Sequence, residues 1–184
     1  MAEIKVLIPG YTSADSGDEK TCATISLVRD GDIVMVVDPG VLESQKMLVD
    51  KLKENGLTID EVNYVFLTHS HVDHYRNTGM FPKAKVIEFF GIWEGQSVED
   101  WKEQLTKDIK IIKTPGHAST SLSLLVNTKD GIVAIVGDVF WKENYPKEDQ
   151  YADEPIKLEV SRETVLKAAD WIVPGHANIY KVKK

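Results

Sequence analysis

Residues 67–74 read Leu67-Thr68-His69-Ser70-His71-Val72-Asp73-His74 and carry three of the chain's five histidines. They follow the apolar run of residues 62–67, which predicts a buried strand with the cluster at its carboxyl end. Neutral imidazole is the commonest protein ligand for zinc and iron. A lone His-x-His pair is more often surface or core, but here an Asp-His pair follows it directly. The stretch therefore predicts a metal site.

The two remaining histidines stand at similar positions. His117 ends Thr114-Pro115-Gly116-His117, and His176 ends Val173-Pro174-Gly175-His176. Each follows an apolar run that reads as a strand, and a Pro-Gly pair turns the chain sharply off the strand end. All five histidines are thus found where metal ligands are expected.

The cluster offers more ligands than one ion takes. His69 and His71 are two residues apart and can face one side, whereas Asp73 and His74 lie one turn onward, at the start of a helix. Because a single ion takes three or four ligands and these four cannot converge, we expect His69 and His71 to hold one metal and Asp73 and His74 another. The two Pro-Gly-His histidines are available to complete the sites.

Two aspartates outside the cluster are further candidates. Asp138, in Gly137-Asp138 after the apolar run 132–136, offers a carboxylate that can bridge two cations with its two oxygens. Gly-Asp after a strand is often only a turn, but the accompanying histidines favour the bridging role. Asp38, in Val37-Asp38-Pro39-Gly40, has two open roles: an acceptor that orients a ligand histidine, which we favour, or a turn residue.

The order of the predicted elements indicates an α/β (α+β) fold. The predicted strands are residues 4–8, 24–28, 33–37, 62–67, 85–89, 109–113, 122–126, 132–136 and 171–173, the last strand. One helix is expected over residues 42–55, with Leu48 and Leu52 on one face. A second is expected to start at Ser161, as its N-cap, and to run to Ala169. Two sheets packed face to face with helices outside account for this order.

The remaining segments are less informative. Residues 142–155 contain prolines, tyrosines and acidic side chains and are expected to form a loop, either a flap over the site or a connector. At 184 residues the chain is expected to form one domain, residues 1–184. Tyr11, Trp93, Trp141 and Tyr145 are candidates for lining a substrate cleft, with ordinary packing as the alternative.

Composition and charge narrow the class of protein. The formal net charge of −7 disfavours RNA as a partner, because it repels a polyphosphate backbone. No apolar run approaches the roughly 20 residues that span a bilayer, and no secretory signal is recognised, so we expect no membrane partner. Cys22, the single cysteine, is expected to be a small buried residue. These features favour a cytoplasmic protein.

The order of the candidate ligands resembles that of the metallo-β-lactamase-fold hydrolases, and the match extends from about Ile4 to Ile179. This resemblance implies a four-layer αββα sandwich with two mixed sheets, helices outside and the site at one edge of both sheets. It implies a first metal bound by His69, His71 and His117, a second bound by Asp73, His74 and His176, and a bridging Asp138.

Residues 73–82, 137–140 and 169–176 resemble a narrower group of metallo-β-lactamase domain-containing proteins with vertebrate and prokaryotic members. A vertebrate member of that group is described as an endoribonuclease. Other branches fit less well, since the chain has no room for the β-CASP insertion or the helical domain of glyoxalase II, and His71 stands where flavodiiron proteins have Glu. The departures leave a minimal hydrolase core.

These features together predict a metal-dependent hydrolase with a dinuclear site, which lowers the pKa of bound water to about 7 and supplies hydroxide. The expected substrate is a small ester, thioester or lactone. Asp73 and Asp138 are the expected catalytic carboxylates, with Asp73 orienting the hydroxide and carrying its proton to the leaving group. The cofactors are expected to be two divalent transition-metal ions, zinc by preference and iron or manganese as alternatives.

Two other functions remain open at this point. An RNA phosphodiesterase like the vertebrate relative requires a basic groove beside the metals. An iron-dependent sulfur dioxygenase requires a single iron and leaves His74 and His176 without metal.

Overall fold

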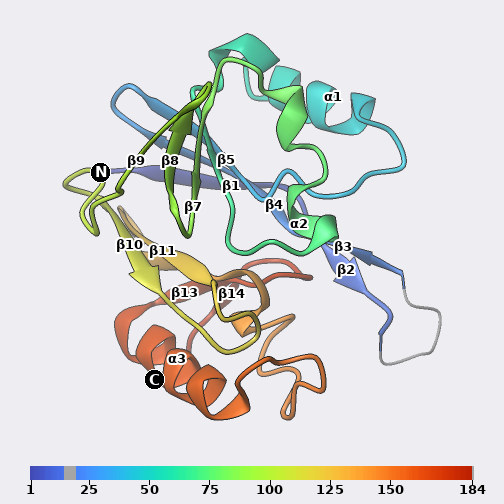
Figure 1. Ribbon diagram of the computed structural model, residues 1–184, viewed down its shortest axis with the longest axis vertical. Coiled ribbons are helices and arrows are strands. Elements are labelled where there is room, and N and C mark those ends of the chain that lie inside the picture. The colour runs from blue at the N-terminus through green and yellow to red at the C-terminus, as the bar shows by residue number, and fades with distance from the viewer. Residues whose placement is uncertain (15–19, 184) are drawn as a thin grey trace.

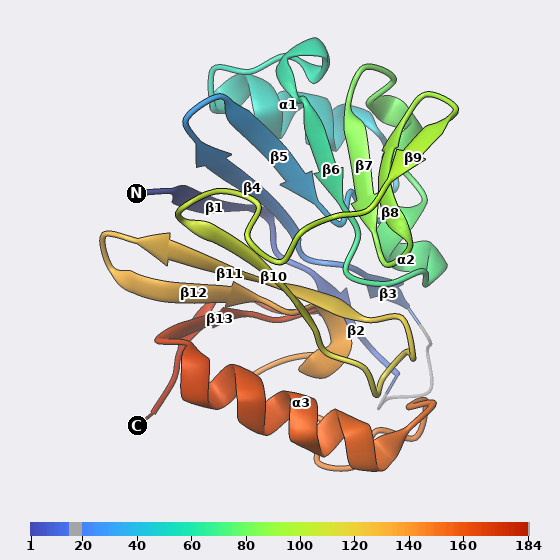
Figure 2. The same cartoon turned by 60° about the vertical axis from the view of Figure 1, so that its left-hand side comes forward.

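The structure is a computed structural model that describes residues 1–14 and 20–183. Within these residues two larger β-sheets pack face to face, and a helix covers the outer face of each (Figure 1). Figure 2 shows the four layers edge-on. The αββα arrangement expected from the sequence is confirmed.

The first sheet has seven strands among the described residues, in the order β1-β4-β5-β6-β7-β8-β9. Their bounds are β1 Glu3–Ile8, β4 Ile25–Asp30, β5 Ile33–Val37, β6 Tyr64–Phe66, β7 Lys85–Glu88, β8 Gly91–Glu94 and β9 Ser97–Glu99. The described part of the second sheet has the order β10-β11-β12-β13-β14. Its strands are β10 Ile109–Lys113, β11 Leu122–Thr128, β12 Gly131–Ile135, β13 Trp171–Val173 and β14 Tyr180–Lys181.

Short elements complete the fold. A small ribbon pairs β2 (Tyr11–Thr12) with β3 (Thr21–Cys22). The helices are α1 Lys46–Glu54, α2 Val72–Tyr75 and α3 Pro155–Ala168, with 3-10 turns η1 Ile59–Glu61, η2 Thr78–Met80 and η3 Gly137–Val139. A membrane-crossing helix is not among these described helices, because each is too short or too polar for that role.

Successive side chains of a strand point to opposite faces of its sheet, so apolar strands form a core on both faces of each sheet. In the first sheet Val28 and Val37 face the second sheet, whereas Leu27 and Val36 face α1. The helix α1 presents the expected apolar face, with Leu48 and Leu52 fully buried. On the other side α3 packs on the outer face of the second sheet in a third core cluster. Burial at about 25 cal/mol per Å² of apolar surface holds the layers together.

Parallel pairing brings the carboxyl ends of the strands that precede the candidate ligands to one edge of the sandwich. β5, β6 and β7 are mutually parallel, and so are β12 and β13, so the carboxyl ends of each set meet. β10 ends beside the start of β11, where Lys113 pairs with Leu122. A hydrogen bond from the Leu122 amide to the Thr68 carbonyl, 2.7 Å, joins the two sheets at this edge.

The predicted start of the first helix was wrong by four residues. Asp38 and Gly40 both have positive φ, 47° and 72°, which turns the chain off β5. The Gly40 amide then donates to the His74 carbonyl (2.9 Å), and the Gly40 carbonyl accepts from the Asn77 amide (3.2 Å). Because this backbone is held against the histidine segment, the helix α1 begins only at Lys46, with Gln45 as its N-cap.

The predicted N-cap at Ser161 was also wrong. The helix α3 begins at Pro155, where the fixed φ of proline suits a first turn. Ser161 lies inside the helix, and its hydroxyl donates to the Pro115 carbonyl at 2.7 Å. The predicted loop therefore ends at residue 154, and α3 is tied to the turn that carries His117.

The sequence also missed short strands. Residues 171–173 form β13 as predicted but are not the last strand, since β14 follows. The hairpin strands β8 and β9 were missed because they are only four and three residues long, and β9 is exposed throughout. The ribbon β2–β3 has two residues on each side, too few to show a periodic pattern.

Candidate metal centre

The turn after β6 is fixed by a buried carboxylate. Asp38 accepts two hydrogen bonds from Thr68, from its amide to Oδ1 (2.8 Å) and from its hydroxyl to Oδ2 (2.7 Å). The next residues pass over the sheet edge, and α2 begins after His71, which occupies the N-cap position. Asp73 and His74 thus lie in the first turn of α2, as expected from the sequence.

One group of candidate ligands comprises His69, His71, His117 and Asp138, whose nearest ligand atoms all lie within 4.8 Å of one another. His69 Nε2 is 3.0 Å from His71 Nδ1, and His117 Nε2 is 3.1 Å from the same atom. Three imidazole nitrogens that face one point at this spacing form a ready set of donors for one cation.

A second group comprises Asp73, His74 and His176, whose ligand atoms also lie within 4.8 Å of one another. Asp73 Oδ2 is 3.9 Å from His74 Nε2 and 3.7 Å from His176 Nε2. His74 and His176 are buried, whereas Asp73 is partly exposed. This group therefore has one side towards solvent.

Asp138 lies between the two groups. Its Oδ1 is 3.3 Å from His74 Nε2 and 3.1 Å from His176 Nε2, and its Oδ2 is 3.3 Å from His117 Nε2. The structure thus brings together all seven residues predicted from the sequence, in the expected two groups. Their roles as metal ligands stay a prediction.

Hydrogen bonds to the far side of two rings of the second group fix which nitrogen faces the centre. Nδ1 of His74 lies 2.8 Å from Asp38 Oδ2, and Nδ1 of His176 lies 3.0 Å from the Cys22 carbonyl. A carbonyl or carboxylate accepts from Nδ1–H, which leaves Nε2 with its lone pair towards the centre. Asp38 therefore contacts a candidate ligand, as we favoured. Cys22 is buried, as expected.

Sequence reasoning missed the corresponding partner of His117. Asp149 Oδ2 accepts from His117 Nδ1 at 2.7 Å, and the Asp149 side chain is fully buried. The same segment adds two backbone bonds to the His117 turn, from the Asp153 amide to the His117 carbonyl (3.0 Å) and from the Glu154 amide to the Gly116 carbonyl (2.9 Å). Asp149 is one of several acids in a loop without periodicity, so the only available signal was this local excess of carboxylates.

The polar atoms of the centre fit a cation. His74 Nε2 and Asp138 Oδ1 are buried and have no hydrogen-bond partner. Leaving such atoms unsatisfied costs about 1–3 kcal/mol each, and a bound cation removes that cost. Imidazole and carboxylate donors together suit zinc, iron and manganese. The donor set of this site is therefore consistent with metal ions of that class.

Burial and neighbouring charges shift the pKa values of the histidines of the centre in two directions. Burial, helped by the neighbouring His74, lowers the pKa of His69 well below its ordinary value of 6.5, and burial also lowers the pKa of His71. Burial opposes the charged form of His74 too, but the carboxylates of Asp138 and Asp38 outweigh it and hold the pKa well above 6.5. Burial likewise opposes charge on His176, and Asp138 raises the pKa of that ring.

Asp138 remains ionised in this environment. Burial disfavours its charge, but His176 and His74 outweigh this and hold the pKa of the carboxyl well below its ordinary value of 3.8. A carboxylate that keeps its charge in a buried position is suited to hold cations.

The four candidate aromatic residues have different positions. The Trp141 ring lies 6.4 Å from that of His117 and 6.5 Å from that of His176, and it packs against Tyr145 at 5.9 Å. Trp141 is therefore a buried neighbour of two candidate ligands. Tyr11 and Trp93 are exposed.

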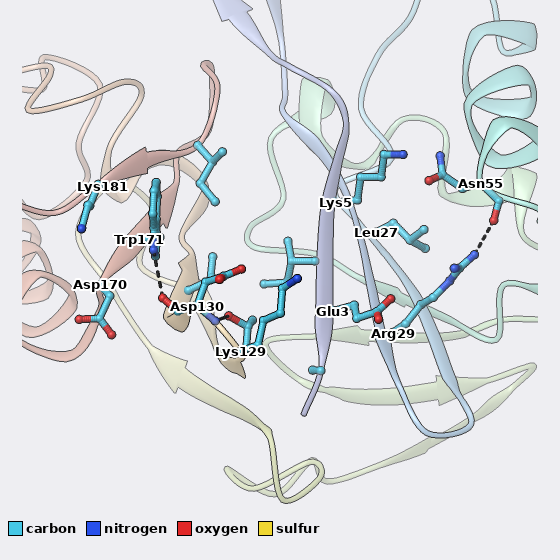
Figure 3. A pocket seen from close by; sticks show the side chains of 15 residues that line it. Glu3, Lys5, Leu27, Arg29, Asn55, Lys129, Asp130, Asp170, Trp171 and Lys181 are labelled. Atoms are coloured by element: carbon cyan, nitrogen blue, oxygen red, sulfur yellow. Dashed lines mark hydrogen bonds between the residues drawn. The ribbon is translucent and has the colours of Figure 1, made fainter.

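A cavity of about 740 Å³ lies away from the candidate metal centre, beside β1 and the turn between β11 and β12. Figure 3 shows Lys5 and Arg29 on one side of it and Asp130 and Trp171 on the other. Arg29 donates to the Asn55 carbonyl (2.6 Å), and the Trp171 indole donates to the Asp130 carbonyl (3.2 Å). None of the seven candidate ligands lines this cavity, so it is not part of the centre.

Comparison with known proteins gives a consistent result. Residues 23–107 match the model of the metallo-beta-lactamase superfamily. Metallo-beta-lactamase domain-containing protein 1 of Xenopus laevis is 29 % identical over 98 % of this chain and 82 % of its own length. A Methanocaldococcus jannaschii protein named as a metallo-hydrolase is 31 % identical over 81 % of this chain and 74 % of its own length. The chain spans 49 % of a related Caenorhabditis elegans protein and 59 % of the human one.

Solved structures share the fold. A Thermotoga maritima protein described as a metallo-beta-lactamase superimposes with a TM-score of 0.75 at 25 % identity, over 98 % of this chain and 99 % of its own. An N-acyl homoserine lactone hydrolase with its product N-hexanoyl-L-homoserine at the catalytic metal centre gives 0.72 at 18 % identity, over 95 % and 92 %. With the identity and coverage of the archaeal relative, these matches show that the chain belongs to the metallo-beta-lactamase superfamily of metal-dependent hydrolases.

Proposed function

We propose that this protein hydrolyses a small ester, thioester or lactone at a centre of two divalent transition-metal ions, zinc by preference. The observation that carries the proposal is the position of Asp138, whose two oxygens lie 3.1–3.3 Å from histidine nitrogens of both groups. In the proposal His69, His71 and His117 hold one ion, Asp73, His74 and His176 hold the other, and Asp138 bridges them.

The residues of this chain divide the work. When bound, the two ions supply a hydroxide nucleophile near neutral pH and polarise the scissile carbonyl. Asp138 keeps its negative charge and holds the two groups at a fixed separation. Asp73 is the more accessible carboxylate, with a side chain 16 % exposed against 6 % for Asp138. We assign to Asp73 the uptake of the proton and its transfer to the leaving group.

Two considerations favour a small uncharged substrate. The net charge of −7 disfavours a polyphosphate ligand. Some proteins of the same fold are N-acyl homoserine lactone hydrolases, one of them with its product at the metal centre. Because each proposed ligand set draws on both sheets, residues 1–184 are proposed to act as one domain. The single cysteine suits the reducing cytoplasm, where we place the protein.

The test is elemental analysis of protein purified without chelator, followed by assays on p-nitrophenyl acetate, a thioester and a γ-lactone. We expect close to two equivalents of metal per chain and hydrolysis that a chelator abolishes and added zinc restores. Less than half an equivalent of zinc, iron or manganese, or turnover that resists chelation, contradicts the proposal.

The same experiment separates two other activities. Chelator-sensitive cleavage of single-stranded RNA at physiological salt without esterase activity indicates a phosphodiesterase. A single iron per chain, with oxygen consumed in the presence of a persulfide, indicates a sulfur dioxygenase. Either outcome replaces the proposed substrate class.

A further inference from the structure

A second cavity, of about 240 Å³, adjoins the first ligand group. His69 forms part of its wall, together with Leu67, Tyr75, Phe89, Phe90 and Thr120. Among the aromatic side chains of this wall, Phe90 is 70 % exposed and Tyr75 is 39 % exposed. Exposed aromatic rings therefore gather directly beside a predicted metal ligand.

The fold explains why these residues meet. β6 and β7 are parallel, so Leu67, just after β6, and Phe89, just after β7, emerge at the same edge as the histidine cluster. Phe89 and Phe90 form the turn of the β7–β8 hairpin, with their rings edge-to-face at 5.3 Å. Thr120 comes from the segment between β10 and β11 of the other sheet. The cavity thus lies at the sheet edge that carries the candidate metal centre, with Thr120 as its one described lining residue from the second sheet.

Its one carboxylate in the described part of the chain is already paired, and the other polar side chains of its wall include the hydroxyls of Ser70 and Thr120. Glu88 lines the cavity, but its Oε1 accepts from the Trp93 indole (2.7 Å) and its Oε2 from the Phe90 amide (3.1 Å). These bonds hold the hairpin in place and occupy both oxygens of the carboxylate. The surface offered to a ligand is therefore mainly aliphatic and aromatic. A closed, wholly apolar cavity of about 150 Å³ takes up benzene, so the volume of about 240 Å³ is enough for a group of that size.

We propose that this cavity binds an apolar substituent of the substrate, a medium-length alkyl chain or an aryl ring next to the scissile ester or lactone bond. The inference rests on the proposed function, because the only link that the described residues offer between the cavity and the scissile bond is His69, which belongs both to the cavity wall and to the first ligand group. It narrows the substrate class to esters and lactones with such a group. Short polar esters leave the cavity empty.

The inference predicts a dependence on chain length. Across p-nitrophenyl acetate, butyrate and hexanoate, kcat/KM is expected to rise by about fourfold for each buried methylene, the factor that corresponds to its transfer from water. A second series, with acetate esters of longer alcohols, distinguishes an acyl substituent from an alcohol substituent. If neither series shows a rise in the wild-type protein, the inference is wrong.

Two substitutions test the location. Thr120→Phe fills the cavity and Phe90→Ala removes one wall, so both are expected to lower the ratio of hexanoate to acetate turnover by tenfold or more. Val98→Ala is the matched control, because Val98 is an exposed apolar residue of the neighbouring strand β9 and does not line the cavity. A ratio that is unchanged in both cavity variants, or equally reduced in Val98→Ala, overturns the assignment.

A binding measurement separates failure of this inference from failure of the proposed function. Calorimetry on the metal-loaded protein compares hexanoate with acetate, with no turnover required. We expect tighter binding of hexanoate, and loss of the difference in Thr120→Phe. Absence of hydrolysis with this binding pattern contradicts the proposed function alone, whereas hydrolysis with equal binding of the two acids contradicts the cavity assignment alone.

Discussion

The carboxylate of Asp149 accepts a hydrogen bond from Nδ1 of His117 at 2.7 Å, and both side chains are buried. Because the ring is bonded on that side, its Nε2 faces the other candidate ligands, 3.1 Å from His71 Nδ1. The later part of the segment of residues 142–154 is therefore more than a connector, because it is bonded to the His117 turn. It supplies a partner that orients a predicted ligand.

Asp149→Ala is expected to weaken metal binding at the first group by about 10- to 100-fold, the usual effect of losing the carboxylate behind a ligating histidine. Asp149→Asn retains an acceptor oxygen and is expected to recover most of the affinity. Competition against a fluorescent chelator measures both constants in metal-depleted protein. The control is Asp153→Ala, which removes the bond to the Ser119 amide (3.0 Å) but leaves the His117 ring bonded. Equal affinities in Asp149→Ala and the control contradict the role.

Asp138→Ala is expected to abolish hydrolysis while the domain stays folded. The substitution removes the carboxylate that faces both groups, so two cations are left without the charge between them. Metal content, circular dichroism and turnover on p-nitrophenyl esters are measured together. A variant that keeps both metals and near-full turnover shows that Asp138 is only a turn residue.

Gly175→Ala is expected to act like Asp138→Ala although it removes no ligand. A Cβ atom at Gly175 lies 1.9 Å from Asp138 Oδ1, so the carboxylate must move away from the centre. Gly79→Ala is the matched control, since a Cβ there meets nothing within 4 Å. We expect at least tenfold lower turnover and reduced metal content in the first variant and wild-type values in the second. Normal metal content in Gly175→Ala means that the site tolerates the displaced carboxylate.

Acidification is expected to release the metal of the second group first. The pKa values of His74 and His176 are raised above 6.5, so protons compete for these rings at a higher pH than for the rings of His69 and His71. The pKa values of His69 and His71 are lowered, so these rings stay neutral and available as the pH falls through 6.5. Metal content after dialysis at stepwise lower pH is expected to pass through one equivalent. Simultaneous loss of both ions refutes this order.

The sequence predicted the centre better than the segments around it. His69, His71 and His74 are three of only five histidines and stand with Asp73 at short fixed spacing after a predicted strand, so local information was sufficient to bring these side chains together. Asp149 could not be assigned, because its contact with His117 depends on the path of a loop without a repeating pattern. Serine favours N-cap positions, which predicts Ser161 as an N-cap, but its hydroxyl donates to a carbonyl 46 residues away in sequence.

Each ligand group takes side chains from both halves of the sandwich: His69 and His74 come from the edge of the first sheet, and His117 and His176 from the edge of the second. An ion bound by either group would therefore cross-link the two sheets, and its binding free energy would add to the free energy that keeps the sheets docked. Metal occupancy then reports on docking of the sheets, even for substitutions far from any ligand. A substitution in the core between the two sheets that loosens this docking is expected to weaken metal binding. The weaker binding should be measurable at a degree of destabilisation that does not yet unfold the protein.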